Sequence, residues 1–308
     1  NISFISASDI LFVFLFLSGL YVLVSQERPT SKKLLFGGAL LGAATLTRPL
    51  GLYVIPLVLL WLLWEERHDA RSMARSAGLC LLGALIVIAP WVARNYTLFH
   101  TLNISSVGSY NLLFYAQEFE HQRTGKSKET VKAEVYERLG ASFTDDISSA
   151  YFAKKDTRVA FDYILAHPFA YAAFHLYSMI PLYLGSSLAM FEGTLYLRGI
   201  LAGDPPFDTN VSLLLRMGDF NGAFSALAAH LPSFIERFLW LVLYMAACIA
   251  LACAIRGRNE HVAAYMLFFA LILAFGLMTG PVAYARYRLP ISPFIFLLVC
   301  AGMASGAR

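Results

Sequence analysis

Charged residues are scarce in this sequence. Asp, Glu, Lys and Arg together make up 14% of the 308 residues, whereas 58% are hydrophobic. A soluble globular domain carries about 25% charged residues, so this composition favours a protein that crosses a membrane. The apolar runs are long and continuous, and they do not alternate with polar residues as the strands of a membrane barrel do. We therefore predict an all-α, polytopic helical membrane protein.

Cysteine is also scarce, and its placement argues against two roles. Cys80, Cys248, Cys253 and Cys300 all lie inside apolar runs, and none has C-x-x-C spacing. Cysteines in such surroundings behave as small hydrophobic side chains. We expect neither a disulfide nor a zinc site, and we assign no metal ligands.

Several motifs of soluble enzymes and binding proteins are missing. The sequence has no Gly-rich phosphate loop, no Ser-His-Asp set and no dinucleotide fingerprint. The net charge of +4 is ordinary for a membrane protein, and no basic, aromatic-interleaved segment indicates a nucleic-acid partner. Glu118 and Glu120 lie in a stretch that we interpret as flexible and solvated.

The chain begins at Asn1 and enters an apolar run almost at once, without the basic segment that opens a signal peptide. We therefore expect it to be part of a longer protein.

The most informative apolar run contains an arginine. It extends from Leu34 to Trp64, with Arg48 and Pro49 near its middle. An arginine at the centre of a spanning helix is costly, and about 20 residues suffice for one crossing. Pro49 also disfavours the helical conformation at Arg48. The run therefore predicts a hairpin of two short membrane helices, with Arg48 at a membrane surface.

Basic loops flank this hairpin on both sides. Lys32 and Lys33 precede it, and Arg67, Arg71 and Arg75 follow it. Short basic loops stay in the cytoplasm, and a hairpin that crosses twice puts both loops there. A single crossing would separate them, so we prefer the double crossing.

The outer face then collects Asp9, Arg48, Arg94 and Asn95. Asp9 has two interpretations, since it opens the first predicted span, Ser8–Val24. It is either a helix N-cap or a group that holds a metal ion or an acceptor hydroxyl.

The chain divides by composition into four segments. Residues 1–95 hold membrane helices, with the hairpin at 34–64. Residues 96–166 form an extracytoplasmic loop region with amphipathic helices over Lys126–Leu139 and Ile147–Ala166. Residues 167–232 form an interfacial or re-entrant segment and a loop, and residues 233–308 hold the C-terminal membrane helices.

The run Phe169–Met190 leaves two topologies open. If it crosses fully, Arg286 and Arg288 face the cytoplasm. If it lies in the interface or dips in and returns, both join the outer face together with Tyr287. The second topology agrees better with the basic-loop bias, and Pro181 would break a straight span.

On that topology the outer face gathers candidates for binding a lipid phosphate: Arg48, Arg94, Arg286, Tyr287 and Arg288. Arginine suits phosphate because its planar fork meets two oxygens and stays charged. The alternative for each residue is that interfacial Arg and Tyr side chains only anchor helix ends.

Three stretches together resemble a known family. Ala44–Leu52, with Leu46-Thr47-Arg48-Pro49, resembles the L-T-R-P hairpin of the GT-C superfamily of polytopic glycosyltransferases, the relatives of dolichyl-phosphate-mannose–protein mannosyltransferase and of the lipid A aminoarabinose transferase. Ala89–Tyr96 resembles their P-W-x-x-R-N span end, and Ala285–Pro293 resembles their late R-Y-R-x-P-x-x-P turn. The order and spacing of the three stretches cover nearly the whole chain.

The resemblance implies a helical bundle with a lateral lipid groove in the bacterial inner (cytoplasmic) membrane. It implies inverting transfer of a sugar from a polyprenyl-phosphate donor to a lipid, glycan or protein acceptor at the outer face. The family's catalytic base is an acidic residue in the first outer loop, which would lie upstream of Asn1. Within this chain Asp9 is the one catalytic candidate. The resemblance implies no certain cofactor and leaves a divalent cation open.

Two other functions share the interfacial cations. A flippase or transporter of polyprenyl-linked sugars is the main alternative, and a non-enzymatic scaffold is the third. Ion-coupled transporters usually carry charged groups at mid-membrane. None occurs mid-span in 34–46, 50–64, 76–92 or 261–279, which makes transport the weaker interpretation.

Overall fold

The computed structural model describes residues 2–25, 29–188, 218–257, 259, 261–282 and 284–306. Within these ranges every regular element is helical, which confirms the all-α class. Three of the described helices are long and apolar enough to cross a membrane: Ala70–Phe99, His230–Arg256 and Val262–Thr279. The contacts group the chain into two units, one formed by Asn1–Tyr177 with Glu260–Val282, the other by Ser178–Asn259 with Ala283–Arg308.

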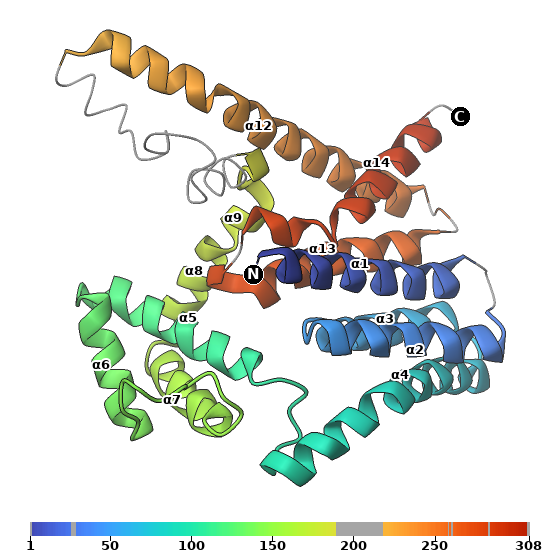
Figure 1. Cartoon of the computed structure of the whole chain (residues 1–308). Helices are drawn as coiled ribbons and strands as arrows, with labels where there is room; N and C mark the ends of the chain where they lie inside the picture. The colour runs from blue at the N-terminus through green and yellow to red at the C-terminus, as the bar shows by residue number, and fades with distance from the viewer. Residues whose placement is uncertain are drawn as a thin grey trace. The chain divides into compact units, whose positions relative to one another are not determined.

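The first unit begins with four helices packed side by side (Figure 1). They are α1 (Ile2–Val24), α2 (Ser31–Thr47), α3 (Gly51–Glu65) and α4 (Ala70–Phe99). The predicted hairpin is confirmed, because α2 and α3 are separate helices joined by a tight bend. At about 1.5 Å per residue they are about 25 and 22 Å long, slightly less than a hydrocarbon core of about 30 Å.

The bend between α2 and α3 follows from its sequence. Arg48 has an extended backbone (φ −145°, ψ 120°), as a residue before proline prefers. Its amide still donates to the Ala44 carbonyl at 2.9 Å, and its carbonyl accepts from the Gly51 amide at 2.9 Å. Gly51 is needed because a Cβ there would lie 2.7 Å from the Thr45 hydroxyl. The bend is therefore hydrogen-bonded on both sides of Pro49.

Glycines allow α2 and α4 to approach closely. A Cβ on Gly38 would collide with the Cys80 carbonyl, and one on Gly42 would lie 2.7 Å from the Ala84 carbonyl oxygen. A Cβ on Gly83, from the other helix, would also meet α2 backbone. Small residues four apart are a common seam between membrane helices, since they bring the backbones into contact.

The register of this seam sets the direction of the helices. Gly38 faces Cys80 and Gly42 faces Ala84, while Arg75 donates to the Ser31 hydroxyl at 2.6 and 3.2 Å. The two helices therefore run parallel, so their C-terminal ends lie at the same end of the bundle. We call this the Arg48 end.

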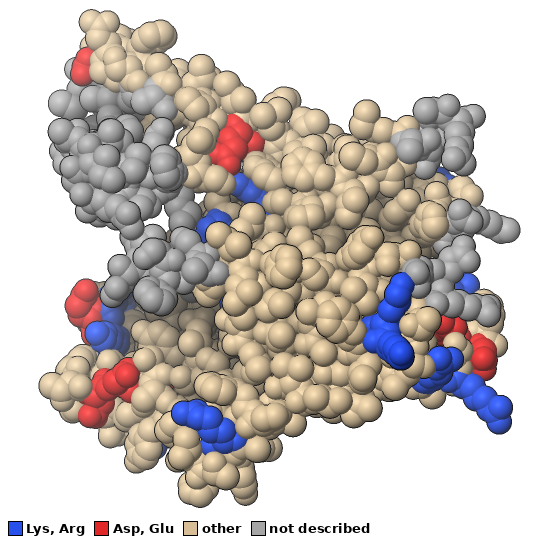
Figure 2. Space-filling model, turned by 45° about the vertical axis from the view of Figure 1, so that its right-hand side comes forward, with Lys and Arg blue, Asp and Glu red and all other residues tan. Residues whose placement is uncertain are grey.

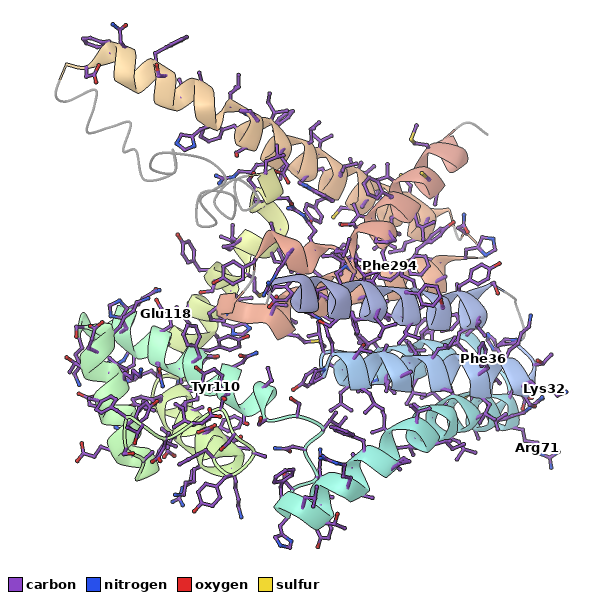
Figure 3. All side chains as sticks on the ribbon, in the orientation of Figure 1. Lys32, Phe36, Arg71, Tyr110, Glu118 and Phe294 are labelled. Carbon is purple, nitrogen blue, oxygen red and sulfur yellow. The ribbon has the colours of Figure 1, made fainter. Side chains whose placement is uncertain are left out.

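The opposite end, which we call the basic end, carries the starts of α2 and α4. Lys32 and Arg71 lie there on neighbouring helices (Figure 3). Lys33, Arg67 and Arg75 belong to the same loops and helix starts.

Three helices of residues 96–166, which we call the polar region, pack into a small core of their own. They are α5 (Val107–Thr124), α6 (Lys128–Leu139) and α7 (Ala153–Ala166). The core includes Leu113, Ala116, Val135, Ala160 and Tyr163. The prediction of an amphipathic helix near 126–139 is confirmed.

Two predictions for this region are wrong. The stretch with Glu118 and Glu120 is not flexible, because it forms helix α5, and Glu120 is buried with its carboxylate 2.8 Å from Arg123. The second amphipathic helix starts at Ala153 and not near Ile147. Asp145 and Asp146 accept from nearby amides and so stabilise turns before the helix.

Helix α13 (Val262–Thr279) passes through the first unit and ends at its Arg48 end. Phe275 packs against Phe12 and Phe16 of α1, with ring centroids 6.3 and 5.8 Å apart. Beyond it, the Tyr115 hydroxyl donates to the Thr279 carbonyl at 2.9 Å. The His175 ring in α8 (Pro168–Ser178) lies 2.8 Å from the Leu277 carbonyl oxygen. The helices of the polar region are thereby attached to the end of α13.

The run 169–190 does not form one straight helix over its described part. It contains α8, with 11 residues, and α9 (Ile180–Leu184), with 5 residues. Neither reaches the about 20 residues that a crossing needs. Residues 189 and 190 lie outside the described residues. The break fits the interfacial or re-entrant alternative and not a straight span.

The second unit contains α9, the long helix α12 (Phe220–Arg256), the short 3-10 helix η3 (Ala285–Arg288) and α14 (Ser292–Gly306). Helices α12 and α14 pack together, with the rings of Trp240 and Phe296 6.2 Å apart. A Cβ on Gly302 would lie 2.5 Å from that of Ala250, so a small residue is also needed at this interface.

The seam between α2 and α4 can be tested with a matched pair of glycines. Gly83→Leu should destabilise the protein by about 1–3 kcal/mol, because the new side chain must push the two backbones apart. Gly78→Leu, on the same helix, should have little effect because a Cβ there meets no atom of the described residues within 4 Å. Thermal unfolding in detergent measures both. Equal melting temperatures for the two variants would contradict the seam.

A buried acid in the loop region gives a pH dependence. Asp156 is 1% exposed, and neither of its carboxylate oxygens has a hydrogen-bond partner among the described residues. Burial raises its pKa from an ordinary 3.8 to about 6. Asp156 therefore binds a proton more readily in the folded state than in the unfolded state. The penalty for ionising Asp156 is complete above about pH 6 and disappears as the pH falls toward 3.8.

Asp156→Asn should therefore stabilise the α5–α7 core at pH 8 by about 2–3 kcal/mol, and by much less at pH 4. Asp162→Asn, at an exposed position of the same helix, is the control. Hydrogen exchange of the α7 amides at both pH values measures the difference. A gain that is the same at pH 4 and pH 8 would show that ionisation of Asp156 is not its cause.

Candidate functional site

Asp9 and Arg48 form an ion pair that joins α1 to the hairpin bend. Their side chains are 20% and 19% exposed. The interpretation of Asp9 as an N-cap is wrong, since α1 already begins at Ile2. The carboxylate instead neutralises the cation that breaks the apolar run. The structure thus brings together two of the residues that the sequence predicted for the outer face.

At the end of α4, Trp91 and Asn95 of the P-W-x-x-R-N motif bind the loop that contains Asn103 and Ile104. The Trp91 indole N–H donates to the Ile104 carbonyl at 2.9 Å. Buried Asn95 donates to the Asn103 carbonyl at 2.9 Å. Arg94 lies over the Trp91 ring at 4.8 Å and donates to the Asn95 side chain at 3.2 Å. Arg94 remains exposed.

A polar hollow of about 210 Å³ lies at this place. It is lined by Trp91, Arg94, Asn95, Phe99, Thr101, Asn103, Ile104, Ser105, Ser106, Ala150 and Ala153. Arg94 is the charged residue of the lining. Helix α5 begins at its rim, directly after Ser106, and the Ser105 hydroxyl accepts from the first amide of that helix, Val107, at 3.1 Å. A helix N-terminus favours negative charge, so both features suit an anion.

In the second unit, Arg288 is buried and held by protein acceptors. It is 2% exposed and lies 4.2 Å above the Trp240 ring. It donates to the carbonyls of Tyr183 and Gly185 at 2.7 and 3.0 Å. Its terminal nitrogen also lies 3.2 Å from the Glu236 carboxylate. The arrangement leaves little of the guanidinium for a ligand.

Glu236 completes this cluster and was not found from the sequence. Besides Arg288, it accepts from the Ser186 hydroxyl at 2.6 Å and from the amides of Ser187 and Leu188 at 2.9 and 3.2 Å. The pair therefore attaches the chain after α9 to α12. The sequence feature that could have indicated it is an acidic residue near the start of an apolar run, where an ionised group needs a partner.

Arg286 differs from Arg288 although the two lie in one turn. It is exposed, lies 4.9 Å from the Tyr287 ring and donates to the Tyr287 hydroxyl at 3.0 Å. Its stacking on an aromatic ring repeats the environment of Arg94. These two arginines have no acidic partner among the described residues, whereas Arg48 and Arg288 do.

The predicted site residues thus form two groups. Asp9, Arg48 and Arg94 lie at one end of the first unit, and Arg286, Tyr287 and Arg288 lie in the second. The convergence of both groups on one lipid phosphate stays a prediction. Surface composition agrees with a membrane setting, since broad areas of the face in Figure 2 carry neither acidic nor basic side chains. All four cysteines are free.

Residues 1–93 match the family model described as dolichyl-phosphate-mannose-protein mannosyltransferase. This segment is therefore similar to the corresponding part of a membrane glycosyltransferase. The match confirms the resemblance for the part of the chain that contains Asp9, Arg48 and Trp91, and it ends one residue before Arg94. No curated protein and no solved structure shows significant similarity to the chain.

The rest of the chain, residues 94–308, lies beyond the matched segment. The third motif, Ala285–Pro293, is among them. The apolar helices α12, α13 and α14 agree with an integral membrane protein over that part as well.

Proposed function

We propose that the protein transfers a sugar from a polyprenyl-phosphate donor to a lipid, glycan or protein acceptor at the outer face of the bacterial inner membrane. One observation carries the proposal. The Asp9–Arg48 pair, which lies inside the family-matched segment, is at the same end of one helix bundle as the Arg94 hollow, whose lining apart from Trp91 follows that segment.

The orientation of the bundle rests on its two unlike ends. The basic end has an excess of Lys and Arg in short loops, as cytoplasmic loops do. The Arg48 end is then the outer face, and the α5–α7 core attached to it is extracytoplasmic. Helix α13 also ends there, and Arg286 follows a few residues later in the sequence. This order supports outward placement of the Arg286–Arg288 turn.

The arginines have two roles in this proposal. Arg94 and Arg286 are exposed and can bind the ligand phosphate, and each is oriented by an aromatic ring. Arg48 and Arg288 are paired with Asp9 and Glu236, and they fix the bends on which the site is built. They contribute positive potential but few free N–H groups.

The chemistry requires two things of the site. A glycosidic bond forms between the acceptor oxygen and the sugar carbon, and the bond from that carbon to the donor phosphate breaks. Negative charge then grows on the leaving phosphate, where arginine N–H groups stabilise it most. The acceptor proton passes to a carboxylate. Asp9, which pairs with Arg48, is the candidate at the Arg48 end.

The arginine assignment predicts a specific loss of transfer. Arg94→Gln should lower sugar transfer by about ten- to a hundredfold, because charge-assisted hydrogen bonds to the leaving phosphate are lost. The measurement is incorporation of radiolabel from a polyprenyl-phosphate sugar into a membrane acceptor extract.

The control is Arg67→Gln, because Arg67 stacks on Trp64 at 5.1 Å but lies at the basic end. It should leave transfer unchanged. Equal rates for the two variants would remove Arg94 from the site. Movement of the labelled donor across the bilayer without transfer would support a flippase in place of the proposed enzyme.

A further inference from the structure

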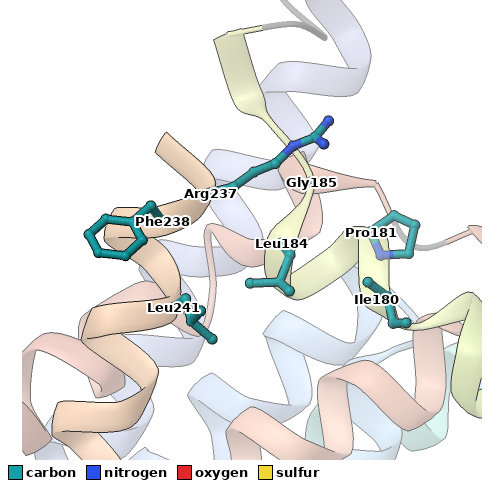
Figure 4. A pocket seen from close by; sticks show the side chains of 7 residues that line it. All are labelled: Ile180, Pro181, Leu184, Gly185, Arg237, Phe238 and Leu241. Carbon is teal, nitrogen blue, oxygen red and sulfur yellow. The ribbon is translucent and has the colours of Figure 1, made fainter. Parts of the chain in front are cut away.

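The second unit contains a larger and more apolar pocket than the Arg94 hollow. It has a volume of about 430 Å³ and lies between α9 and the middle of α12 (Figure 4). Its lining consists of Ile180, Pro181, Leu184, Gly185, Arg237, Phe238 and Leu241. Phe238 and Leu241 are 64% and 44% exposed, so this wall belongs to the free face of α12.

Arg237 is the charged residue of this lining. Its neighbour Glu236 is directed to Arg288 and to the chain after α9. The guanidinium of Arg237 lies 5.8 Å from the Phe234 ring, and no ion pair joins it to another described residue. A cation in an apolar helix is costly unless an anion meets it.

The depth of Arg237 indicates where that anion comes from. The apolar part of α12 extends from His230 to Arg256. At about 1.5 Å per residue, Arg237 and Arg256 are about 28 Å apart along the helix, which is close to the thickness of the hydrocarbon core. With Arg256 at one surface, Arg237 lies at the level of the headgroups of the opposite leaflet. The pocket beside it lies at the depth where acyl chains begin.

We propose that this pocket binds one anionic phospholipid of the surrounding bilayer. The phosphodiester pairs with Arg237, and the first part of one acyl chain occupies the space between α9 and α12. Charge supports this occupant, because one guanidinium balances the single charge of a phosphodiester. A phosphate monoester carries about −1.5 to −2 near neutral pH and would be only partly neutralised.

Such a lipid would connect two elements that the Glu236–Arg288 pair already holds together. It would cover the exposed wall formed by Phe238 and Leu241 and bridge it to Ile180 and Pro181. The inference needs a membrane-spanning α12 but does not depend on sugar transfer, so it can fail or hold independently of the proposed function.

Native mass spectrometry of the purified chain with phosphatidylglycerol tests the proposal. The wild type should retain one lipid, with phosphatidylcholine retained less. Arg237→Gln should weaken retention of phosphatidylglycerol by about tenfold. Leu241→Trp, which fills the pocket but keeps the cation, should weaken it as well. Melting temperatures in lipid-free detergent show whether each variant remains folded.

Arg256→Gln is the matched control, since Arg256 is an exposed arginine at the other end of the same helix. It should retain the lipid as the wild type does. Equal retention by folded Arg237→Gln would overturn the proposal. Displacement of phosphatidylglycerol by an equal concentration of polyprenyl phosphate would overturn it too, because the pocket would then belong to that lipid.

Discussion

The cost of placing a charge among apolar helices governs this structure. Arg48 interrupts an apolar run long enough for two helices. The chain bends at Pro49, and Asp9 from the first helix pairs with the Arg48 cation. Arg288 and Glu236 meet the same constraint in the second unit, where they pair with each other and bond to α9 and to the residues that follow it. Arg94, Arg237 and Arg286 have no acidic partner in the part of the chain that the structure describes, and each lies near an aromatic ring and remains exposed.

The close packing of α2 against α4 decides where the charged groups of the first unit lie. Gly38 and Gly83 let α2 and α4 run parallel in contact, which brings the bend at Arg48 and the end of α4 to one end of the bundle. The loop helices are attached to the same end through Tyr115 and His175. A polar region, a paired bend and an exposed arginine beside a hollow therefore share one side, and the basic loops occupy the other.

The sequence predicted features that depend on local rules. The hairpin followed from the cost of Arg48 and the backbone preference before Pro49, and the break within 169–190 agrees with the alternative that Pro181 favoured. The helix at Lys128–Leu139 followed from its apolar spacing. Two features of residues 96–166 were missed although their contacts are local. The sequence did not show that Glu120 is buried in α5 and pairs with Arg123, three residues further on. The start of α7 was misplaced because Asp145 and Asp146 accept from the amides of Ser142 and Ser148 and so stabilise turns before the helix.

The candidate site shows the same division. Patterns in the sequence selected Arg48, Arg94, Arg286 and Arg288 as cations near a surface, but they did not distinguish paired from unpaired ones. That distinction came from Asp9 and Glu236, which lie far from their partners in the chain.

The Arg48 end and the basic end should lie on opposite sides of the membrane. Single cysteines at Leu50 and Thr101 mark the first end, and single cysteines at Thr30 and His68 mark the second, in a background without the four native cysteines. A membrane-impermeant maleimide added to intact cells with a permeable outer envelope should label positions 50 and 101 and leave 30 and 68 unlabelled until the inner membrane is opened. Labelling of positions 50 and 68 from the same side would contradict the account.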